Sequence, residues 1–276
     1  MSFDHSNAGS GFLGVDVVSG QSAATSVWAT SPLKILTPRP RGPSVWACLG
    51  SFGGGLVAGD EIEVTLRLGA RARCFLSTQA STKVYRNPNA RPCGHRLRAE
   101  LGPGSLLALS PDPVQAFKGS RYCQQQEFLL APGSSLVLVD SLSSGRAACG
   151  ERWSFSRFHS RNEVFLGSKR VVLDSLLLDP QDGPLTSPFR MGRFNCLATV
   201  LLIGELLQNA CSRLLEEFGS EPVVGRPQLV ASASSIENGA LLRLAGESVE
   251  QVASEIRRHL AVLADLLEDD PWSRKF

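Results

Sequence analysis

The stretch Gly-Ser-Phe-Gly-Gly-Gly-Leu-Val-Ala-Gly-Asp, residues 50–60, is the most glycine-dense part of the chain. Residues 61–68 follow as Glu-Ile-Glu-Val-Thr-Leu-Arg-Leu, with aliphatic and polar side chains at alternate positions. This period of two predicts a strand with one buried face. A phosphate-binding glycine loop leads into a helix N-terminus, so a strand at this place argues against a nucleotide site.

The glycines of this loop are expected to be needed for its backbone conformation. Gly54, Gly55 and Gly59 should adopt conformations or close approaches that a Cβ would not allow. We expect Gln79 and Thr82 to be partly buried hydrogen-bonding groups beside this loop. The stretch is therefore interpreted as a tight structural crossing.

A pattern of strand, glycine turn and strand recurs after the loop at intervals of about thirty residues. Its instances are residues 62–76, 97–109 and 128–139. Repeats of this length indicate stacked units that bury their apolar faces against one another. The chain is therefore predicted to be mainly β, with a β-solenoid-like or two-layer β architecture. An ordinary antiparallel sandwich, which also has short strands at regular spacing, stays open as an alternative.

Two helices are predicted in the C-terminal third, over residues 206–218 and 248–267. The second begins with the capping box Ser248-x-x-Gln251 and carries one apolar stripe. Such a stripe indicates core packing, with a partner interface as the alternative. We expect residues 1–276 to form a single domain, with a poorly ordered start within residues 1–30.

Composition excludes several classes of function. The net charge is +2 and basic residues are scattered among acidic ones, which argues against nucleic-acid binding. The longest apolar run, residues 197–203, is far shorter than the roughly 20 residues that span a bilayer. Seven cysteines without a Cys-x-x-Cys pair, and no signal peptide, indicate reduced thiols and a cytoplasmic location. Cys93-Gly-His95 is interpreted as a chance pair, because a structural zinc site needs four ligands.

Acidic residues recur where strands end or turns begin. No Gly-x-Ser-x-Gly elbow occurs, and no nucleophile and base stand in a recognisable arrangement, so the chain is not expected to be an enzyme. The carboxylates are either turn caps or an acidic lining that holds divalent metal ions loosely. The candidates are Asp60, Asp112, Asp140, Glu151 and Asp174.

Several segments, taken in order along the chain, resemble the urease accessory protein UreD family, called UreH in some organisms. They are Ser31-Pro-Leu-Lys-Ile-Leu, Gly54 to Asp60, Thr78-Gln-Ala-Ser-Thr-Lys-Val-Tyr-Arg86, Leu109 to Val114 with Phe117, Ser144-Gly-Arg, and Gly150 to Trp153. The resemblance covers nearly the whole chain, and residues 78–86 are its most specific part. It implies a mostly β fold of β-helical character.

The resemblance also implies a function. What it implies is a non-enzymatic chaperone that binds apo-urease and recruits UreF and, through it, the GTPase UreG, with UreE as a candidate nickel donor. It implies an internal passage for nickel, held in transit with no permanent cofactor. Combined with the strand-end carboxylates, it suggests a path over Asp60, Ser81, Thr82, Asp140, Glu151 and Asp174. The rival interpretations are a carbohydrate-active β-solenoid hydrolase and a scaffold that holds urease open without carrying metal.

Overall fold

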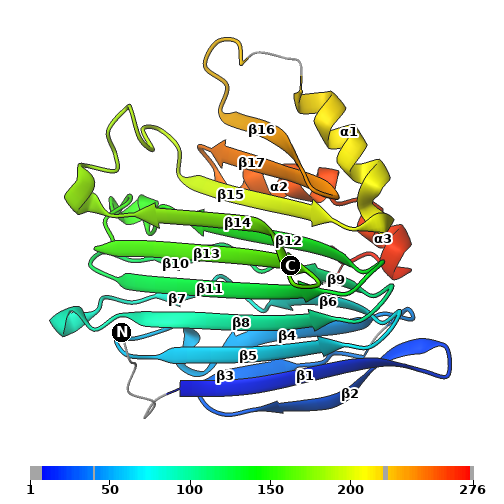
Figure 1. Ribbon diagram of the computed structural model, residues 1–276. Helices are drawn as coiled ribbons and strands as arrows, with labels where there is room; N and C mark the ends of the chain where they lie inside the picture. The colour runs from blue at the N-terminus through cyan, green and yellow to red at the C-terminus, as the bar shows by residue number, and fades with distance from the viewer. Residues whose placement is uncertain (1–7, 40, 220–222, 274–276) are drawn as a thin grey trace.

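The structure, a computed structural model, describes residues 8–39, 41–219 and 223–273. Its strands form two sheets that face each other (Figure 1). The first sheet contains, in spatial order, β14 (Lys169–Leu178), β13 (Arg157–Leu166), β11 (Arg121–Leu130), β8 (Cys93–Leu101), β5 (Glu61–Leu68), β1 (Ala8–Val18) and β2 (Gln21–Ala29). The second contains β16 (Leu229–Ile236), β17 (Gly239–Gly246), β15 (Cys196–Ile203), β12 (Ser135–Ser143), β9 (Leu106–Leu109), β6 (Arg73–Thr78), β4 (Val45–Ser51) and β3 (Leu33–Leu36).

The middle of the chain is a β-solenoid. Each coil places one strand in the first sheet and one in the second. Two coils add a short strand before the chain returns, β7 (Lys83–Val84) in one and β10 (Val114–Ala116) in the next, and these two strands pair with each other. Equivalent strands of successive coils pair in parallel, so that Leu68 lies beside Leu101 and Leu101 beside Leu130. This pairing confirms the solenoid-like prediction. The antiparallel sandwich is wrong for these coils, because the repeating units stack instead of folding back as hairpins.

Antiparallel strands complete the two ends of the solenoid. At the N-terminal end, β2 pairs antiparallel with β1 and β3 pairs antiparallel with β4. At the other end, β14 pairs antiparallel with β13, β15 with β12, and β17 with both β15 and β16. Short 3₁₀ turns join several strands: Phe52–Gly54, Pro88–Ala90, Ala147–Cys149, Pro180–Asp182 and Glu205–Leu207. The predicted poorly ordered start lies partly outside the described residues, and β1 and β2 occupy most of the remainder of residues 1–30.

Three helices lie among the described residues: α1 (Gln208–Phe218), α2 (Val249–His259) and α3 (Val262–Leu267). The second predicted helix is thus two, separated at Leu260 and Ala261. The Ser248 hydroxyl accepts hydrogen bonds from the backbone N–H groups of Glu250 and Gln251, which confirms the Ser248 half of the capping box. The Gln251 Oε1 that should complete the box has no hydrogen-bond partner among the described residues. A partner interface for the apolar stripe is wrong, because its residues pack against the second sheet. They are Val252, Ile256, Leu260, Leu263 and Leu267, all at most 6% exposed.

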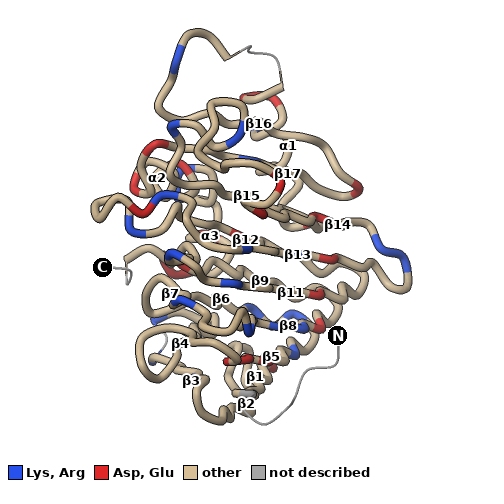
Figure 2. Tube along the Cα trace, turned by 90° about the vertical axis from the view of Figure 1, so that its left-hand side faces the viewer, with Lys and Arg blue, Asp and Glu red and all other residues tan. Residues whose placement is uncertain are grey.

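The second sheet therefore lies between two apolar cores. One core fills the space between the sheets and includes Leu66, Phe128 and Leu138. The other lies between the second sheet and the helices and includes Phe75, Val200 and Ile256. Acidic and basic residues are interspersed over the coils, as the small net charge predicts (Figure 2). On the outer face of the first sheet they pair across strands, for example Arg96 with Glu63 at 3.0 Å.

Candidate functional site

Polar side chains interrupt the core between the sheets. Strand alternation directs every second residue of β11 inward, and these residues include Gln124 and Gln126, followed by Phe128. Parallel pairing places Ser160 beside Gln124 and Asn162 beside Gln126 on β13. The four polar side chains are 2–7% exposed. A buried polar row of this kind requires hydrogen-bond partners, because unpaired groups are costly in a core.

The main partner of this row is Asp140, which reaches it from β12 in the opposite sheet. Its Oδ2 accepts hydrogen bonds from Ser160 Oγ at 2.5 Å and Asn162 Nδ2 at 2.8 Å. Its Oδ1 accepts from Gln124 Nε2 at 3.2 Å, and Tyr122 donates in turn to Gln124 Oε1 at 3.1 Å. Burial raises the pKa of Asp140, and the donated hydrogen bonds offset part of this rise. The carboxylate is thus held in place by three donors yet is poorly solvated.

A first cavity of about 200 Å³ lies between the sheets on one side of Asp140. Its lining includes the glycine loop and the segment 77–82, and the exposed residues Gly54 and Gln79 show that it reaches the surface there. The inner wall carries His95, Tyr122 and Gln124. The cavity therefore connects the loop that dominates the sequence with the buried polar row.

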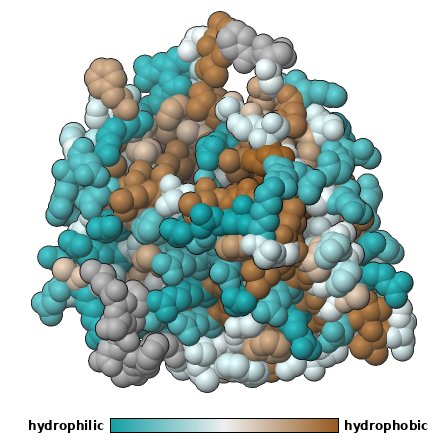
Figure 3. All heavy atoms as spheres, in the orientation of Figure 1, coloured by the Kyte–Doolittle hydropathy of each residue, from teal (hydrophilic) through white to brown (hydrophobic). Residues whose placement is uncertain are grey.

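A second cavity of about 470 Å³ lies on the other side of Asp140, where the first sheet ends at β14 and the second sheet continues through β15, β17 and β16. Asp174 lines it and pairs with Arg243 at 2.7 Å. The exposed residues Arg243 and Val223 line its outer part, and hydrophobic surface gathers in this region (Figure 3). Asp140 and Ser141 line both cavities, so the carboxylate stands where the two adjoin.

The structure brings together some of the residues predicted from the sequence. Ser81, Thr82, Gly54, Gly55 and Gln79 line the first cavity. Thr82 is half-buried as expected, whereas Gln79 lies at the opening and is exposed, so the expected partial burial is wrong for Gln79. The hydrogen bonding expected of the two side chains is not found among the described residues.

Two carboxylates lie apart from both cavity linings. Asp60 caps its turn, because its Oδ2 accepts a hydrogen bond from Val57 N at 2.8 Å. Glu151 forms two contacts with the Arg146 guanidinium, at 2.6 and 3.0 Å, and the hydrogen bond from Arg146 lowers the pKa of Glu151. Of the acidic candidates, Asp112 and Asp140 line the first cavity, and Asp140 and Asp174 line the second.

The glycines of the loop are required for two different reasons. Gly54 and Gly59 have φ values of +73° and +85°, in the left-handed region that side chains with a Cβ rarely adopt. Gly55 is instead close to its neighbours, since a Cβ there would lie 2.5 Å from the carbonyl oxygen of Lys83. Both reasons agree with the prediction of a tight crossing.

Sequence reasoning missed much of the buried polar row: Tyr122, Gln124, Gln126, Ser160 and Asn162. A signal was present in β11, because Phe128 and Leu130 define the inward positions of the strand. Extending that alternation backward places glutamines at core positions. Glutamine at the inward-facing positions of a strand indicates that the interior is polar at that place.

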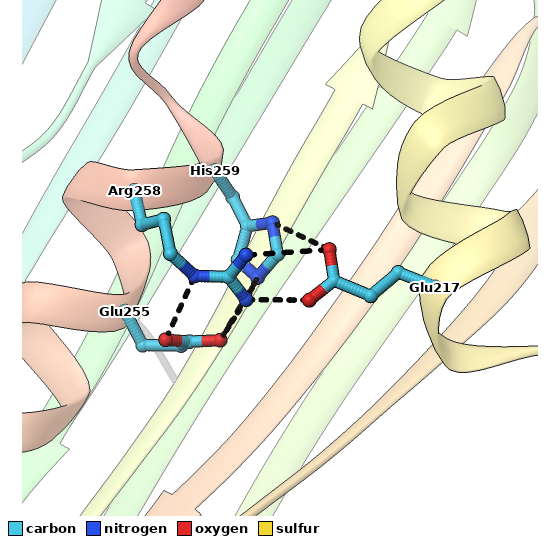
Figure 4. Close-up of polar contacts among 4 residues, drawn as sticks. All are labelled: Glu217, Glu255, Arg258 and His259. Carbon is cyan, nitrogen blue, oxygen red and sulfur yellow. Dashed lines mark hydrogen bonds and ion pairs between the residues drawn. The ribbon is translucent and has the colours of Figure 1, made fainter. Parts of the chain in front are cut away.

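A cluster of Glu217, Glu255 and His259 on α1 and α2 could also be considered as a metal site. However, the Arg258 guanidinium lies between the two carboxylates, at 2.6 Å from Glu217 and 2.5 Å from Glu255 (Figure 4). His259 Nε2 lies 3.1 Å from Glu255 as well. Because the Arg258 guanidinium already pairs with both carboxylates, we interpret the cluster as an ion-pair network that ties α1 to α2. Among the described residues, the helices are all too short or too polar to cross a membrane.

Comparison with known proteins agrees with this architecture across the chain. The family model described as "UreD urease accessory protein" matches residues 8–275. A "Urease accessory protein UreD" of Sorangium cellulosum is 49% identical over 98% of this chain and 85% of its own length. A "Urease accessory protein UreD" of Anaeromyxobacter is 40% identical over 97% of this chain and 89% of its own length. A "Urease accessory protein D" of Arabidopsis thaliana is 33% identical over 94% of this chain and 98% of its own length. The chain therefore belongs to the UreD urease accessory protein family.

Proposed function

We propose that this chain is a non-catalytic chaperone of urease maturation that conducts nickel into the urease active site. Membership of the urease accessory family supports the role in maturation. The proposed partners are the urease apoprotein, UreF, and the GTPase UreG bound through UreF, with UreE as a nickel donor, all in the cytoplasm. Because the glycine loop leads into a strand, GTP hydrolysis is assigned to the partner.

The observation that carries the conduction proposal is the position of Asp140. Two cavities, of about 200 and 470 Å³, adjoin at this carboxylate, and each has exposed residues in its lining. An ion that passes from one to the other meets Asp140 on the way. Gln124, Ser160 and Asn162 supply the hydrogen bonds that orient the carboxylate.

The electrostatics of Asp140 favour a passing cation. Burial raises the pKa of this carboxyl, which means that the bare carboxylate is destabilised where it stands. A divalent cation relieves that penalty as a proton does. Carboxylate and amide oxygens bind nickel less tightly than imidazole or thiolate does, so the ion can leave again. Asp174 should bind a passing nickel ion more weakly, because Arg243 already pairs with its carboxylate.

The test is nickel delivery in a reconstituted system of urease apoprotein, this chain, UreF and UreG. Asp140→Ala and Asp140→Asn should leave the complex assembled but lower the nickel content and activity of urease several-fold. Glu127→Gln is the matched control, because Glu127 lies on the outer face of β11 and is absent from the linings of the two cavities.

Full nickel incorporation by both Asp140 variants would show that conduction through these cavities is wrong and would leave the metal-free scaffold as the better explanation. Asp60→Asn and Glu151→Gln complete the comparison, because both residues lie away from the two cavities. We expect them to lower delivery less than the Asp140 variants do.

A further inference from the structure

His95 is the one residue with a basic side-chain nitrogen among the described residues that line the first cavity. It lies on β8, between Ile62 of β5 and Gln124 of β11 in the parallel register. Gln124 is the residue that donates to Asp140. The imidazole is therefore one strand away from the polar row that holds the carboxylate.

Within the part of the chain that the structure describes, the His95 ring forms no side-chain hydrogen bond. Its Nε2 is buried and has no hydrogen-bond partner among the described residues. A buried polar atom without a partner costs about 1–3 kcal/mol, so a fold with a purely structural need at this place would favour an apolar side chain. His159, by contrast, lies on β13 with its Nε2 3.2 Å from Ser175 Oγ.

The protonation state of His95 suits metal binding. Burial lowers its pKa to about 4, so the ring is neutral at physiological pH. A neutral imidazole always has one nitrogen with a free lone pair, whichever nitrogen carries the proton. No proton has to leave when a cation binds, and the ring simply replaces one water molecule of the ion.

The cysteine on the same strand is a less suitable ligand. Cys93 lies two residues earlier on β8 but is only 2% exposed, and it is absent from the lining of the first cavity. Burial raises the pKa of its thiol to about 12, so it is not the thiolate that metals prefer. The remaining polar groups of the cavity wall include the oxygens of Thr78, Tyr122 and Asp140.

We propose that His95 is a transient nitrogen ligand that makes the first cavity select Ni²⁺ over Mg²⁺ and Mn²⁺. The inference rests on the proposed nickel conduction. Oxygen ligands alone discriminate poorly among divalent cations, whereas imidazole affinity increases from Mn²⁺ through Co²⁺ to Ni²⁺. Combined with the Asp140 carboxylate, one nitrogen ligand gives selectivity without the strong retention that several nitrogen or sulfur ligands would cause.

The first test uses the purified full-length chain with histidine labelled by ¹⁵N. Substoichiometric Ni²⁺ should broaden the ring resonances of His95 and leave those of His159 sharp, while Mg²⁺ should change neither. In equilibrium dialysis, His95→Gln should lower Ni²⁺ affinity at least about tenfold, since even residues that only support metal ligands contribute that much. Affinity for Mn²⁺ should change much less. His159→Gln is the matched control.

The second test separates this inference from the proposed function. In reconstituted urease activation with Ni²⁺ and excess Mn²⁺, His95→Gln should increase the manganese found in urease, measured by elemental analysis. If Asp140→Asn blocks delivery while His95→Gln matches the wild type in binding and selectivity, the ligand role of His95 is refuted and conduction stands. If neither variant alters delivery, both proposals fall. Sharp His95 resonances in the presence of Ni²⁺ would overturn the ligand role even if the variant did not fold.

Discussion

Replacement of Asp140 by asparagine should separate its charge from its shape. In the wild type, Oδ2 accepts hydrogen bonds from Ser160 and Asn162, and Oδ1 accepts from Gln124. The asparagine oxygen can take the place of Oδ2. Its amino group then faces Gln124, whose side-chain amide can turn over to present its oxygen. Tyr122 can follow, since its hydroxyl accepts as well as donates.

This rearrangement leads to a small effect on stability. Asp140→Asn remakes the hydrogen bonds to residue 140 but loses the one from Gln124 Nε2 to Ser160 Oγ, because the single Ser160 proton is already donated to residue 140. Its free energy of unfolding should therefore lie about 1 kcal/mol below that of the wild type at pH 5. Asp140→Ala removes the acceptor of three donors at once. At about 1 kcal/mol for each lost hydrogen bond, the alanine variant should lose about 3 kcal/mol.

The pH dependence gives a sharper test. Burial raises the pKa of Asp140 above its ordinary value of 3.8, so the folded chain binds more protons there than the unfolded chain. The stability contributed by Asp140 therefore decreases as pH rises from the ordinary value through the raised one, and then becomes constant. Asparagine does not titrate. The stability of Asp140→Asn relative to the wild type should thus increase with pH over the same interval.

The assay is urea unfolding, followed by circular dichroism, of the wild type and both variants between pH 4 and pH 8. Ser141, which also lines both cavities, provides the control variant Ser141→Ala, with no titrating group changed. A loss of stability in Asp140→Asn as large as in Asp140→Ala would refute the amide rearrangement. A stability difference between Asp140→Asn and the wild type that does not vary with pH would refute the raised pKa.

Two further predictions concern the loop and the helices. Gly59→Val should lose about 1–3 kcal/mol in urea unfolding, because φ is +85° and a Cβ would lie 2.5 Å from Arg91 Nε; wild-type stability would show that this conformation is not required. Deletion of residues 247–276 should abolish cooperative thermal unfolding, because it uncovers the core under α2 and α3; a cooperatively folded truncation would show that these helices are dispensable.

Much of the fold was predictable because the relevant physics is local. Alternation over residues 61–68 identified a strand, and the recurrence of strand, glycine turn and strand indicated stacked coils. The Ser248 cap was predictable for the same reason, since its hydroxyl bonds the backbone two and three residues ahead. Motifs such as residues 78–86 were sufficient for the family resemblance.

Local patterns were less informative about which strand-end carboxylates matter. Asp60, Asp140 and Glu151 are equivalent candidates in the sequence, yet the fold makes the first a turn cap and the third the partner of Arg146. Similarly, the apolar stripe of residues 249–267 could serve a core or a partner, and only the second sheet packed against it decides in favour of the core.

The candidate site was decided by tertiary structure alone. Asp140 comes from β12 in one sheet, while Ser160 and Asn162 come from β13 in the other, 20 and 22 residues later in the chain. Their meeting depends on the register with which successive coils stack and on the separation of the two sheets. Sequence spacing specifies neither, because the loops between strands vary in length. The polar interior and its two cavities are therefore properties of the stacked coils.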